Sequence, residues 1–100
     1  RAVIHHGGAG TTAAGLRAGI PSIVIPFAGD QMFWGKRVHA IGAGPRPINV
    51  KELTAMRLVS ALVEAEDQAV QGRARLAGEL IRVENGVGEA IRVVESRRVE

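Results

Sequence analysis

The sequence predicts an α/β fold: part of a doubly wound, Rossmann-like parallel sheet, incomplete, with a carboxyl end rich in helices. Two short runs rich in β-branched residues, at 2–5 and 22–25, are separated by a glycine turn and an alanine-rich stretch, which is the order of a strand, helix, strand unit. Beyond residue 54 the apolar residues recur at helical spacing. Parallel strands need neighbours on both edges, so a sheet this narrow looks like half of a domain. We therefore expect a fragment, with residues upstream of Arg1 completing the sheet.

The composition is that of an ordinary folded domain. The chain has 100 residues, 46% of them hydrophobic and 23% charged, which is too apolar for a disordered segment. No apolar run approaches the roughly 18 residues of a membrane span, and no cysteine is present to form a disulfide or a thiolate metal site. The net charge of +3 comes without a basic stripe, so no nucleic-acid partner is expected. We expect a cytoplasmic location, with peripheral attachment of the full-length protein to membranes left open.

The first strand and helix follow from local chemistry. Residues 2–5 predict a buried parallel strand that runs into the glycine turn. Thr11 or Thr12 can cap a helix whose body is 13–18, because a threonine hydroxyl accepts a hydrogen bond from a free amide of the first turn. Gly19 supplies the left-handed residue that ends this helix.

The second strand, at 22–25, is closed by Pro26. Asp30 is the expected cap of the next helix, which Gly42 ends. Its apolar positions, spaced i, i+4 and i+7, are Trp34, Val38 and Ile41, and we expect Trp34 in the core. Residues 43–48 contain two prolines and predict at most a short edge strand.

Three helices are expected toward the carboxyl end. Thr54 caps the first, whose apolar pairs at i, i+4 are Leu58 with Leu62 and Val59 with Val63. The second, at about 68–84, carries a stripe of Val70, Ala74, Ala77 and Ile81 and ends at Asn85 and Gly86. The last carries Val87, Ala90, Ile91 and Val94 opposite a polar, solvated face.

The glycine turn has the composition of a phosphate cradle. Residues 5–12 read His-His-Gly-Gly-Ala-Gly-Thr-Thr and lie where open α/β sheets bind ligands, between the end of a strand and the start of a helix. Free amides and partial positive charge at a helix start attract phosphate, and glycines let the backbone come close to it. Thr11 adds a hydroxyl and His6 a further donor. The segment can therefore hold a diphosphate.

Several other interpretations of the turn compete with this one. A nucleoside-triphosphate P-loop is excluded, because Thr11 and not lysine follows the last glycine. A dinucleotide fingerprint is partly matched by residues 8–13, with Asp30 as the ribose-binding acid, although that acid should close the second strand. A tight turn without any ligand is also open. His5 and His39 lack metal-ligand spacing, so structural roles are expected for both, and no metal site is predicted.

A long stretch resembles a known signature. Residues 5–21, His-His-Gly-Gly-Ala-Gly-Thr-Thr-Ala-Ala-Gly-Leu-Arg-Ala-Gly-Ile-Pro, and 26–34, Pro-Phe-Ala-Gly-Asp-Gln-Met-Phe-Trp, closely resemble the donor-binding signature of GT-B glycosyltransferases that use nucleotide sugars. The branch that they look most like is that of the sterol 3-beta-glucosyltransferases. Residues 42–48, 53–54 and 84–88 are similar to the tail of that branch's carboxyl-terminal domain, so the resemblance covers nearly the whole chain.

The resemblance implies roles for individual residues. The diphosphate-binding positions of the family match His6, Gly8, Gly10 and Thr11, and the positions that bind hydroxyls of the donor sugar match Asp30 and Gln31. Ala14 stands where plant members have a ribose-binding acid, which puts the ribose contact in doubt. The aromatic residue that stacks on the base, and a glutamine near it, would lie before Arg1.

The function that the resemblance implies is donor binding in an inverting glycosyltransferase. Residues 1–100 would be part of the donor domain, without a cofactor, and the donor would be UDP-glucose. The acceptor, a lipid or sterol hydroxyl, and a catalytic histidine base would belong to an absent amino-terminal domain, so no catalytic residue is expected in this chain. Two alternatives stay open: a dinucleotide-binding half-domain of an oxidoreductase, and an inactive remnant that serves as an interaction module.

Overall fold

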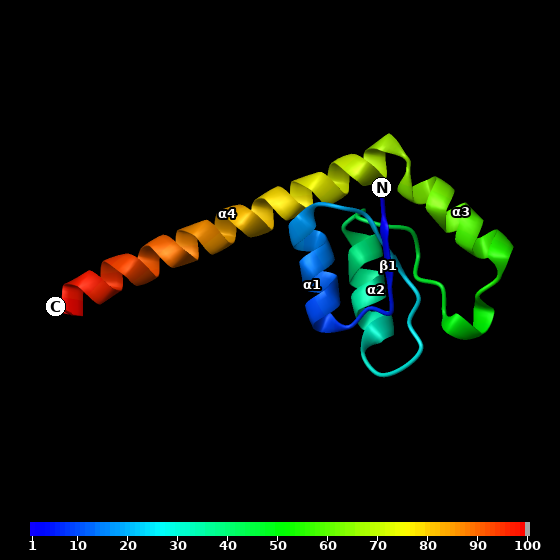
Figure 1. Ribbon diagram of the computed structural model, residues 1–100, viewed down its shortest axis with the longest axis horizontal. Coiled ribbons are helices and arrows are strands. Elements are labelled where there is room, and N and C mark those ends of the chain that lie inside the picture. The colour runs from blue at the N-terminus through cyan, green and yellow to red at the C-terminus, as the bar shows by residue number, and fades with distance from the viewer. Residues whose placement is uncertain (100) are drawn as a thin grey trace.

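The α/β class is confirmed by the computed structural model, which describes the backbone of residues 1–99 and the side chains of residues 1–84. The elements in chain order are β1 (Val3–His5), α1 (Ala9–Ala18), β2 (Ser22–Val24), α2 (Gln31–Ala40), the 3-10 helix η1 (Val50–Glu52), α3 (Ala55–Ala65) and α4 (Gln68–Val99). The body is made of the elements up to α3, and α4 runs past α1 and away from that body (Figure 1). The dimensions of the molecule, 60 × 31 × 17 Å, reflect this projecting helix.

The centre of the body is a two-stranded parallel sheet with helices on both faces. β1 pairs with β2 in the register Val3 to Ser22 and His5 to Val24. Because successive side chains of a strand point to opposite faces, β2 contributes to two cores. One contains Val24 with Val38, Ala43 and Ala74, and the other contains Ile23 and Ile25 with Ala61 and Ala65. α1 and α2 therefore cover one face of the sheet and α3 covers the other.

The first strand is less buried than predicted. Ile4 is 50% exposed, whereas all three residues of β2 are buried. The reason is that Ile4 pairs with Ile23, on the face covered by α3, and α3 packs over β2. In the described part of the chain β1 is an edge strand.

Residues 43–48 run beside β2 but form no strand, contrary to the edge strand expected there. The amide of Ser22 donates to the carbonyl of Ala43 over 3.1 Å, and the amide of Ile48 donates to the carbonyl of Val24 over 3.0 Å. Pro45 and Pro47, which lie between these two bonds, have no amide hydrogen to complete the ladder.

Helix α1 begins earlier than predicted. Its cap is Gly8, the first helical bond runs from the amide of Thr12 to the carbonyl of Gly8 over 2.8 Å, and no side chain caps it, so the capping role expected of Thr11 or Thr12 is wrong. The sequence offered threonine as the better cap, but Thr12 faces inward and is buried, while Thr11 is exposed. The end at Gly19 is confirmed, with a φ of 72°.

Helix α2 approaches the sheet through a glycine. A Cβ built on Gly35 would lie 2.8 Å from the Cβ of Pro47 and 3.1 Å from the Cγ1 of Val24. This close contact turns the buried face toward Gly35 and Val38. Trp34 is consequently only half-buried and Ile41 is exposed, so the expected core positions are right for Val38 alone.

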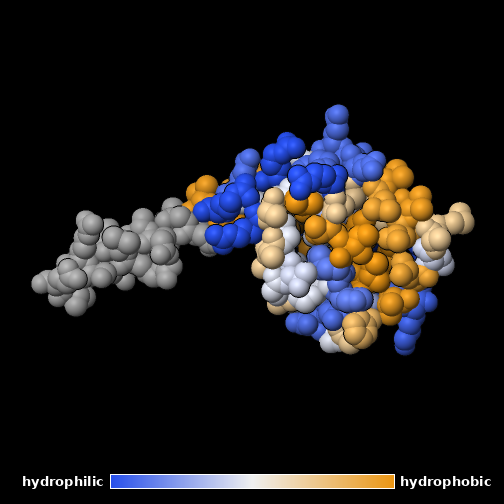
Figure 2. All heavy atoms as spheres, in the orientation of Figure 1, coloured by the Kyte–Doolittle hydropathy of each residue, from blue (hydrophilic) through white to orange (hydrophobic). Residues whose placement is uncertain are grey.

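Helix α3 has the predicted cap and a different buried face. The amide of Arg57 donates to the hydroxyl of Thr54 over 3.1 Å, as expected. The residues that face the core are Ala61 and Ala65 with Leu58 packed beside them, whereas Val59 and Val63 are 58% and 65% exposed. Figure 2 shows apolar side chains gathered over this side of the molecule.

Helix α4 carries the predicted stripe and lacks the predicted break. Ala74 is buried, and Val70, Ala77 and Ile81 are half-buried. The helix is continuous through Asn85 and Gly86, residues that weaken a helix by only about 1 kcal/mol or less each. The expected stripe of Val87, Ala90, Ile91 and Val94 lies outside the described side chains. No helix in the described part of the chain is both long and apolar enough to cross a membrane.

Candidate functional site

Two turns meet at the carboxyl ends of the strands. The first follows β1 and the second follows β2. The amide of Ile25 donates to the carbonyl of His5 over 2.8 Å, and the carbonyl of Ile25 accepts from Nδ1 of His6 over 2.9 Å. These bonds fix the second turn directly beside the first.

Gly7 brings the start of α2 against the glycine turn. Its φ is +93°, a conformation that favours glycine, and a Cβ there would lie 2.7 Å from Cγ1 of Val24 and 2.8 Å from the carbonyl oxygen of Gln31. The fold therefore requires glycine at this position. The contact also places the predicted sugar-binding pair next to the predicted diphosphate-binding set.

The start of α1 is open on the side of these turns. The amides of residues 9–11 precede the first helical hydrogen bond and have no partner within the helix. A Cβ built on Gly8 or Gly10 would meet no atom within 4 Å, and neither residue has a positive φ. Packing and backbone geometry thus leave both positions free to carry a side chain. Because both residues are glycine, no side chain fills the space next to the free amides. The hydroxyl-bearing residue Thr11 is exposed beside these amides.

His6 is an exposed ring with one nitrogen engaged. Nδ1 donates to the Ile25 carbonyl, and the ring packs edge-on against Phe27, with centroids 5.0 Å apart and an interplanar angle of 73°. Nε2 has no partner among the described residues. The imidazole is held in place and can use Nε2 toward a ligand.

Asp30 and Gln31 each have one side-chain polar atom engaged by the protein and another without a partner among the described residues. Oε1 of Gln31 accepts from the amides of Phe27 and Ala28 over 2.8 and 3.1 Å, which leaves its amide nitrogen as a donor. Oδ2 of Asp30 accepts from Nε1 of Trp34 over 3.1 Å, which leaves Oδ1. The side chain of Asp30 makes no capping bond to α2, contrary to the expected cap, because Trp34 engages it instead.

Trp34 and His5 support the site in ways that the sequence did not indicate. Trp34 was expected in the core and instead holds the carboxylate of Asp30. Nδ1 of His5 accepts a hydrogen bond from the amide of Gly7 over 3.0 Å. Burial, and to a lesser extent the nearby His6, lower the pKa of His5. The spacing of a polar side chain two residues before a turn glycine is the signal that could have identified this bond.

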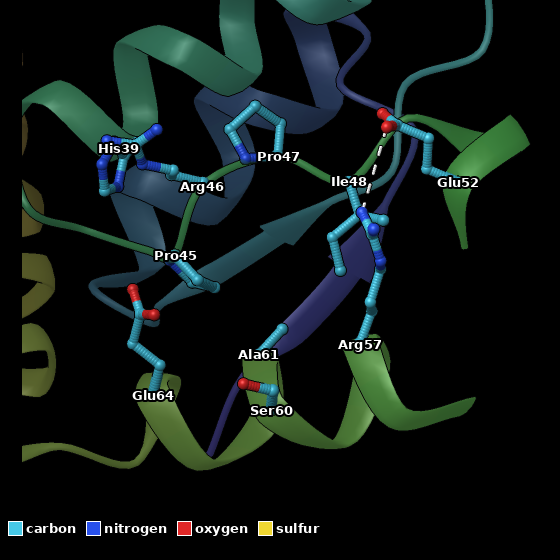
Figure 3. Close-up of a pocket in the computed structure, with 10 residues that line it drawn as sticks. All are labelled: His39, Pro45, Arg46, Pro47, Ile48, Glu52, Arg57, Ser60, Ala61 and Glu64. Atoms are coloured by element: carbon cyan, nitrogen blue, oxygen red, sulfur yellow. Dashed lines mark ion pairs between the residues drawn. The ribbon is translucent and has the colours of Figure 1, made fainter. Parts of the chain in front are cut away.

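A separate depression of about 540 Å³ lies between residues 45–48 and α3. It is lined by His39, Pro45, Arg46, Pro47, Ile48, Glu52, Arg57, Ser60, Ala61 and Glu64 (Figure 3). Its charges are mixed, and Arg57 reaches toward Glu52 at 3.9 Å. Nδ1 of His39 donates to the Gly44 carbonyl over 3.1 Å, a structural role as expected. None of the lining residues comes from the two turns. Among the side chains described, no three His, Asp or Glu gather in a group that could hold a metal ion.

Comparison with known proteins gives a consistent set of relatives. Residues 1–84 match the family model described as erythromycin biosynthesis protein CIII-like, C-terminal domain. Over 92 residues the chain is 48% identical to a sterol 3-beta-glucosyltransferase of Arabidopsis thaliana, covering 92% of the chain and 14% of that protein. Over 94 residues it is 49% identical to a sterol 3-beta-glucosyltransferase of Cryptococcus neoformans, covering 93% of the chain and 6% of that protein. The chain thus spans a small part of these relatives.

Two solved structures share the fold. The glycosyltransferase of kitacinnamycin is 33% identical with a TM-score of 0.80, and the match covers 95% of this chain and 25% of that one. The glycosyltransferase VinC, solved in complex with DTDP, is 27% identical with a TM-score of 0.70 over the same shares of the two chains. Both are GT-B glycosyltransferases, which confirms the predicted fold family.

Proposed function

The chain belongs to the erythromycin biosynthesis protein CIII-like family of glycosyltransferase C-terminal domains, and from this premise we propose that it binds the nucleotide-sugar donor of an inverting glucosyltransferase. The donor's diphosphate rests on the start of α1 and its hexose reaches the start of α2. The observation that carries the proposal is the open surface at Gly8 and Gly10, where neither packing nor φ requires a glycine. A ligand that must approach the backbone amides is a physical reason for glycine there.

The diphosphate is bound by the start of α1 and by His6. The free amides of residues 9–11 lie at the start of α1, where the helix dipole favours an anion. The exposed hydroxyl of Thr11 adds a further donor. A protonated His6 donates from Nε2 while Nδ1 keeps its bond to Ile25. The complex of VinC with DTDP supports a nucleoside diphosphate as the ligand.

The hexose hydroxyls are bound by Asp30 and Gln31. Oδ1 of Asp30 accepts from one hydroxyl, and the amide nitrogen of Gln31 donates to another. The contact of Gly7 with the Gln31 carbonyl keeps this pair within reach of a ligand on the glycine turn. The names of the relatives support glucose as the sugar and a sterol as the acceptor. Uridine as the nucleoside, and a lipid hydroxyl more generally as the acceptor, are supported by the resemblance of the signature.

The contribution of this chain to transfer is to stabilise the leaving group. An acceptor hydroxyl attacks the anomeric carbon, the bond from that carbon to the diphosphate oxygen breaks, and the hydroxyl proton passes to a base outside residues 1–100. Negative charge then grows on the diphosphate. Amides 9–11, the Thr11 hydroxyl and a protonated His6 are oriented before the reaction, so they stabilise this charge without reorganising. Acceptor binding belongs to another domain of the protein.

The dinucleotide-binding alternative is not favoured. Its ribose-binding acid should close the second strand, whereas Asp30 stands at the start of α2, six residues beyond the end of β2 at Val24. The matching relatives described above are glycosyltransferases.

Calorimetry on the intact natural protein with UDP and with UDP-glucose tests the proposal. His6→Ala should weaken both ligands about 10- to 100-fold, the range for a hydrogen bond to a charged group. Asp30→Asn should weaken UDP-glucose about tenfold and leave UDP unchanged, because only the sugar meets the carboxylate. Glu66→Gln, an exposed carboxylate at the end of α3, serves as the control and should change neither. Unchanged affinity for both ligands in His6→Ala and Asp30→Asn would exclude the assigned roles.

A further inference from the structure

We infer that His5 is a positioning residue of the glycine turn, and that the two adjacent histidines hold their protons on opposite nitrogens, so that only His6 can become charged while the turn stays intact. The inference deepens the proposed function and rests on it for the ligand, a nucleoside diphosphate. The hydrogen bonds that carry it are independent of any ligand.

The bond to Gly7 determines the proton position of His5. An amide N–H can only donate, so Nδ1 of His5, 3.0 Å from the Gly7 nitrogen, must present a lone pair. The single proton of the neutral ring is then on Nε2. Protonating Nδ1 as well would direct an N–H at the amide and break the bond. Gly7 is the residue that packs on Val24 and Gln31, so His5 holds the junction of the two turns.

The bond to Ile25 determines the opposite arrangement in His6. A carbonyl oxygen can only accept, so Nδ1 of His6, 2.9 Å away, carries the proton. Nε2 of the exposed ring is left as the lone-pair nitrogen. A second proton there keeps the Ile25 bond and turns Nε2 into a charged donor, which is the form that binds phosphate.

The surroundings of His5 also keep it neutral. Its Nε2 and the hydroxyls of Thr12 and Ser22 are buried without a hydrogen-bond partner in the described part of the chain. A Cβ built on Gly15 of α1 would lie 3.0 Å from the Ser22 hydroxyl and 4.0 Å from Nε2 of His5, so the ring lies under α1.

Among the described elements packed on β1, no acidic group is available to pair with a charged His5. The elements packed on β1 are β2, which has no ionisable side chain, and α1, whose single ionisable residue is the exposed Arg17. The next residue in the chain is His6, whose imidazole disfavours a positive charge on His5. Desolvation and His6 accordingly lower the pKa of His5.

Two substitutions separate positioning from mere packing. Asparagine at residue 5 can accept from the amide two residues later through Oδ1, as in an Asx turn, whereas leucine fills space and cannot accept. With UDP as the probe and the intact protein at neutral pH, His5→Leu should bind at least tenfold more weakly and His5→Asn within about threefold of wild type. Equal affinity in wild type and His5→Leu would overturn the inference, as would equal losses in His5→Leu and His5→Asn.

The pH profile of UDP binding supplies a readout that packing alone would not change. Acidification should weaken UDP binding as His5 takes up a proton, because a protonated Nδ1 can no longer accept from the amide of Gly7. His5→Asn should therefore lose less affinity on acidification than wild type. An equal loss in the two proteins would contradict the inference.

Nitrogen-15 NMR of the imidazole rings in the wild-type protein tests the proton positions whether or not a variant folds. We expect His5 as the Nε2–H form and His6 as the Nδ1–H form, and the same form in both rings would overturn the inference. Failure of the wild type to bind UDP would refute the proposed function and leave this NMR result as the test of the histidine pair.

Discussion

Replacement of Gly10 by alanine should raise stability and lower donor affinity at the same time. Gly10 is the second residue of α1, and a Cβ built on it meets no atom within 4 Å. Alanine in a helix is more favourable than glycine by about 0.5–1 kcal/mol, because glycine loses more backbone entropy on folding. The same methyl group would stand between the free amides of the helix start and the proposed diphosphate, and we expect UDP to bind at least tenfold more weakly, equivalent to about 1.4 kcal/mol.

Gly72→Ala is the matched control for this prediction. Gly72 also lies in a helix, α4, with no atom within 4 Å of a built Cβ, and it is far in sequence from the turns. Urea unfolding should give a similar gain in the free energy of unfolding for both variants, and calorimetry should give a loss of UDP affinity for Gly10→Ala alone. A stabilised Gly10→Ala protein that binds UDP as tightly as wild type would refute a diphosphate at the start of α1.

Three further outcomes are expected. Gly7→Ala should lower the free energy of unfolding, measured by urea titration, by about 2–5 kcal/mol. A left-handed alanine costs about 1–2 kcal/mol, and overpacking against Val24 and Gln31 costs about 1–3 kcal/mol. A loss below about 1 kcal/mol would contradict the contact. Thr54→Ala should cost about 1 kcal/mol through loss of the α3 cap, with UDP affinity unchanged, so weaker UDP binding would count against the placement of the site. Since the pKa of His5 is lowered in the fold from the ordinary 6.5, the unfolded chain binds more protons in acid, and the free energy of unfolding should fall as pH drops below about 6.5. His5→Asn should lessen that fall in urea titrations at pH 5 and 7, and an identical pH dependence in the two proteins would contradict the assignment.

The parts of the fold that could be predicted are those decided by a few neighbouring residues. Gly19 ends α1 because its φ of 72° suits glycine, and Thr54 caps α3 because its hydroxyl reaches an amide of the first turn. Both rest on interactions within one turn of chain. The parallel strand pair was likewise implied by two β-branched runs on either side of a helix.

The errors arose where distant contacts decide the outcome. α1 begins at Ala9 with Gly8 as its cap, and no threonine caps it, because burial turns Thr12 inward. The buried face of α2 is set by the approach of Gly35 to Pro47, twelve residues away in the sequence. Neither contact leaves a periodic signal in the sequence.

The proximity of the two turns of the candidate site could be predicted from the sequence, and the hydrogen bonds within them could not. The strand, helix, strand order places the ends of parallel strands at one edge, which brings residues 6–11 and 30–31 together. The engagement of Gln31 with two backbone amides, of Asp30 with Trp34 and of His5 with Gly7 depends on side-chain directions within the two turns. Those directions decide which atoms remain for a ligand.

The most direct test of the account is a crystal structure of the intact protein with UDP-glucose bound. We expect the diphosphate oxygens within hydrogen-bond distance of the amides of Gly10 and Thr11 and of Nε2 of His6, and a glucose hydroxyl bonded to Oδ1 of Asp30. A nucleotide seated in the depression between residues 45–48 and α3, or a glucose out of reach of Asp30, would contradict the account.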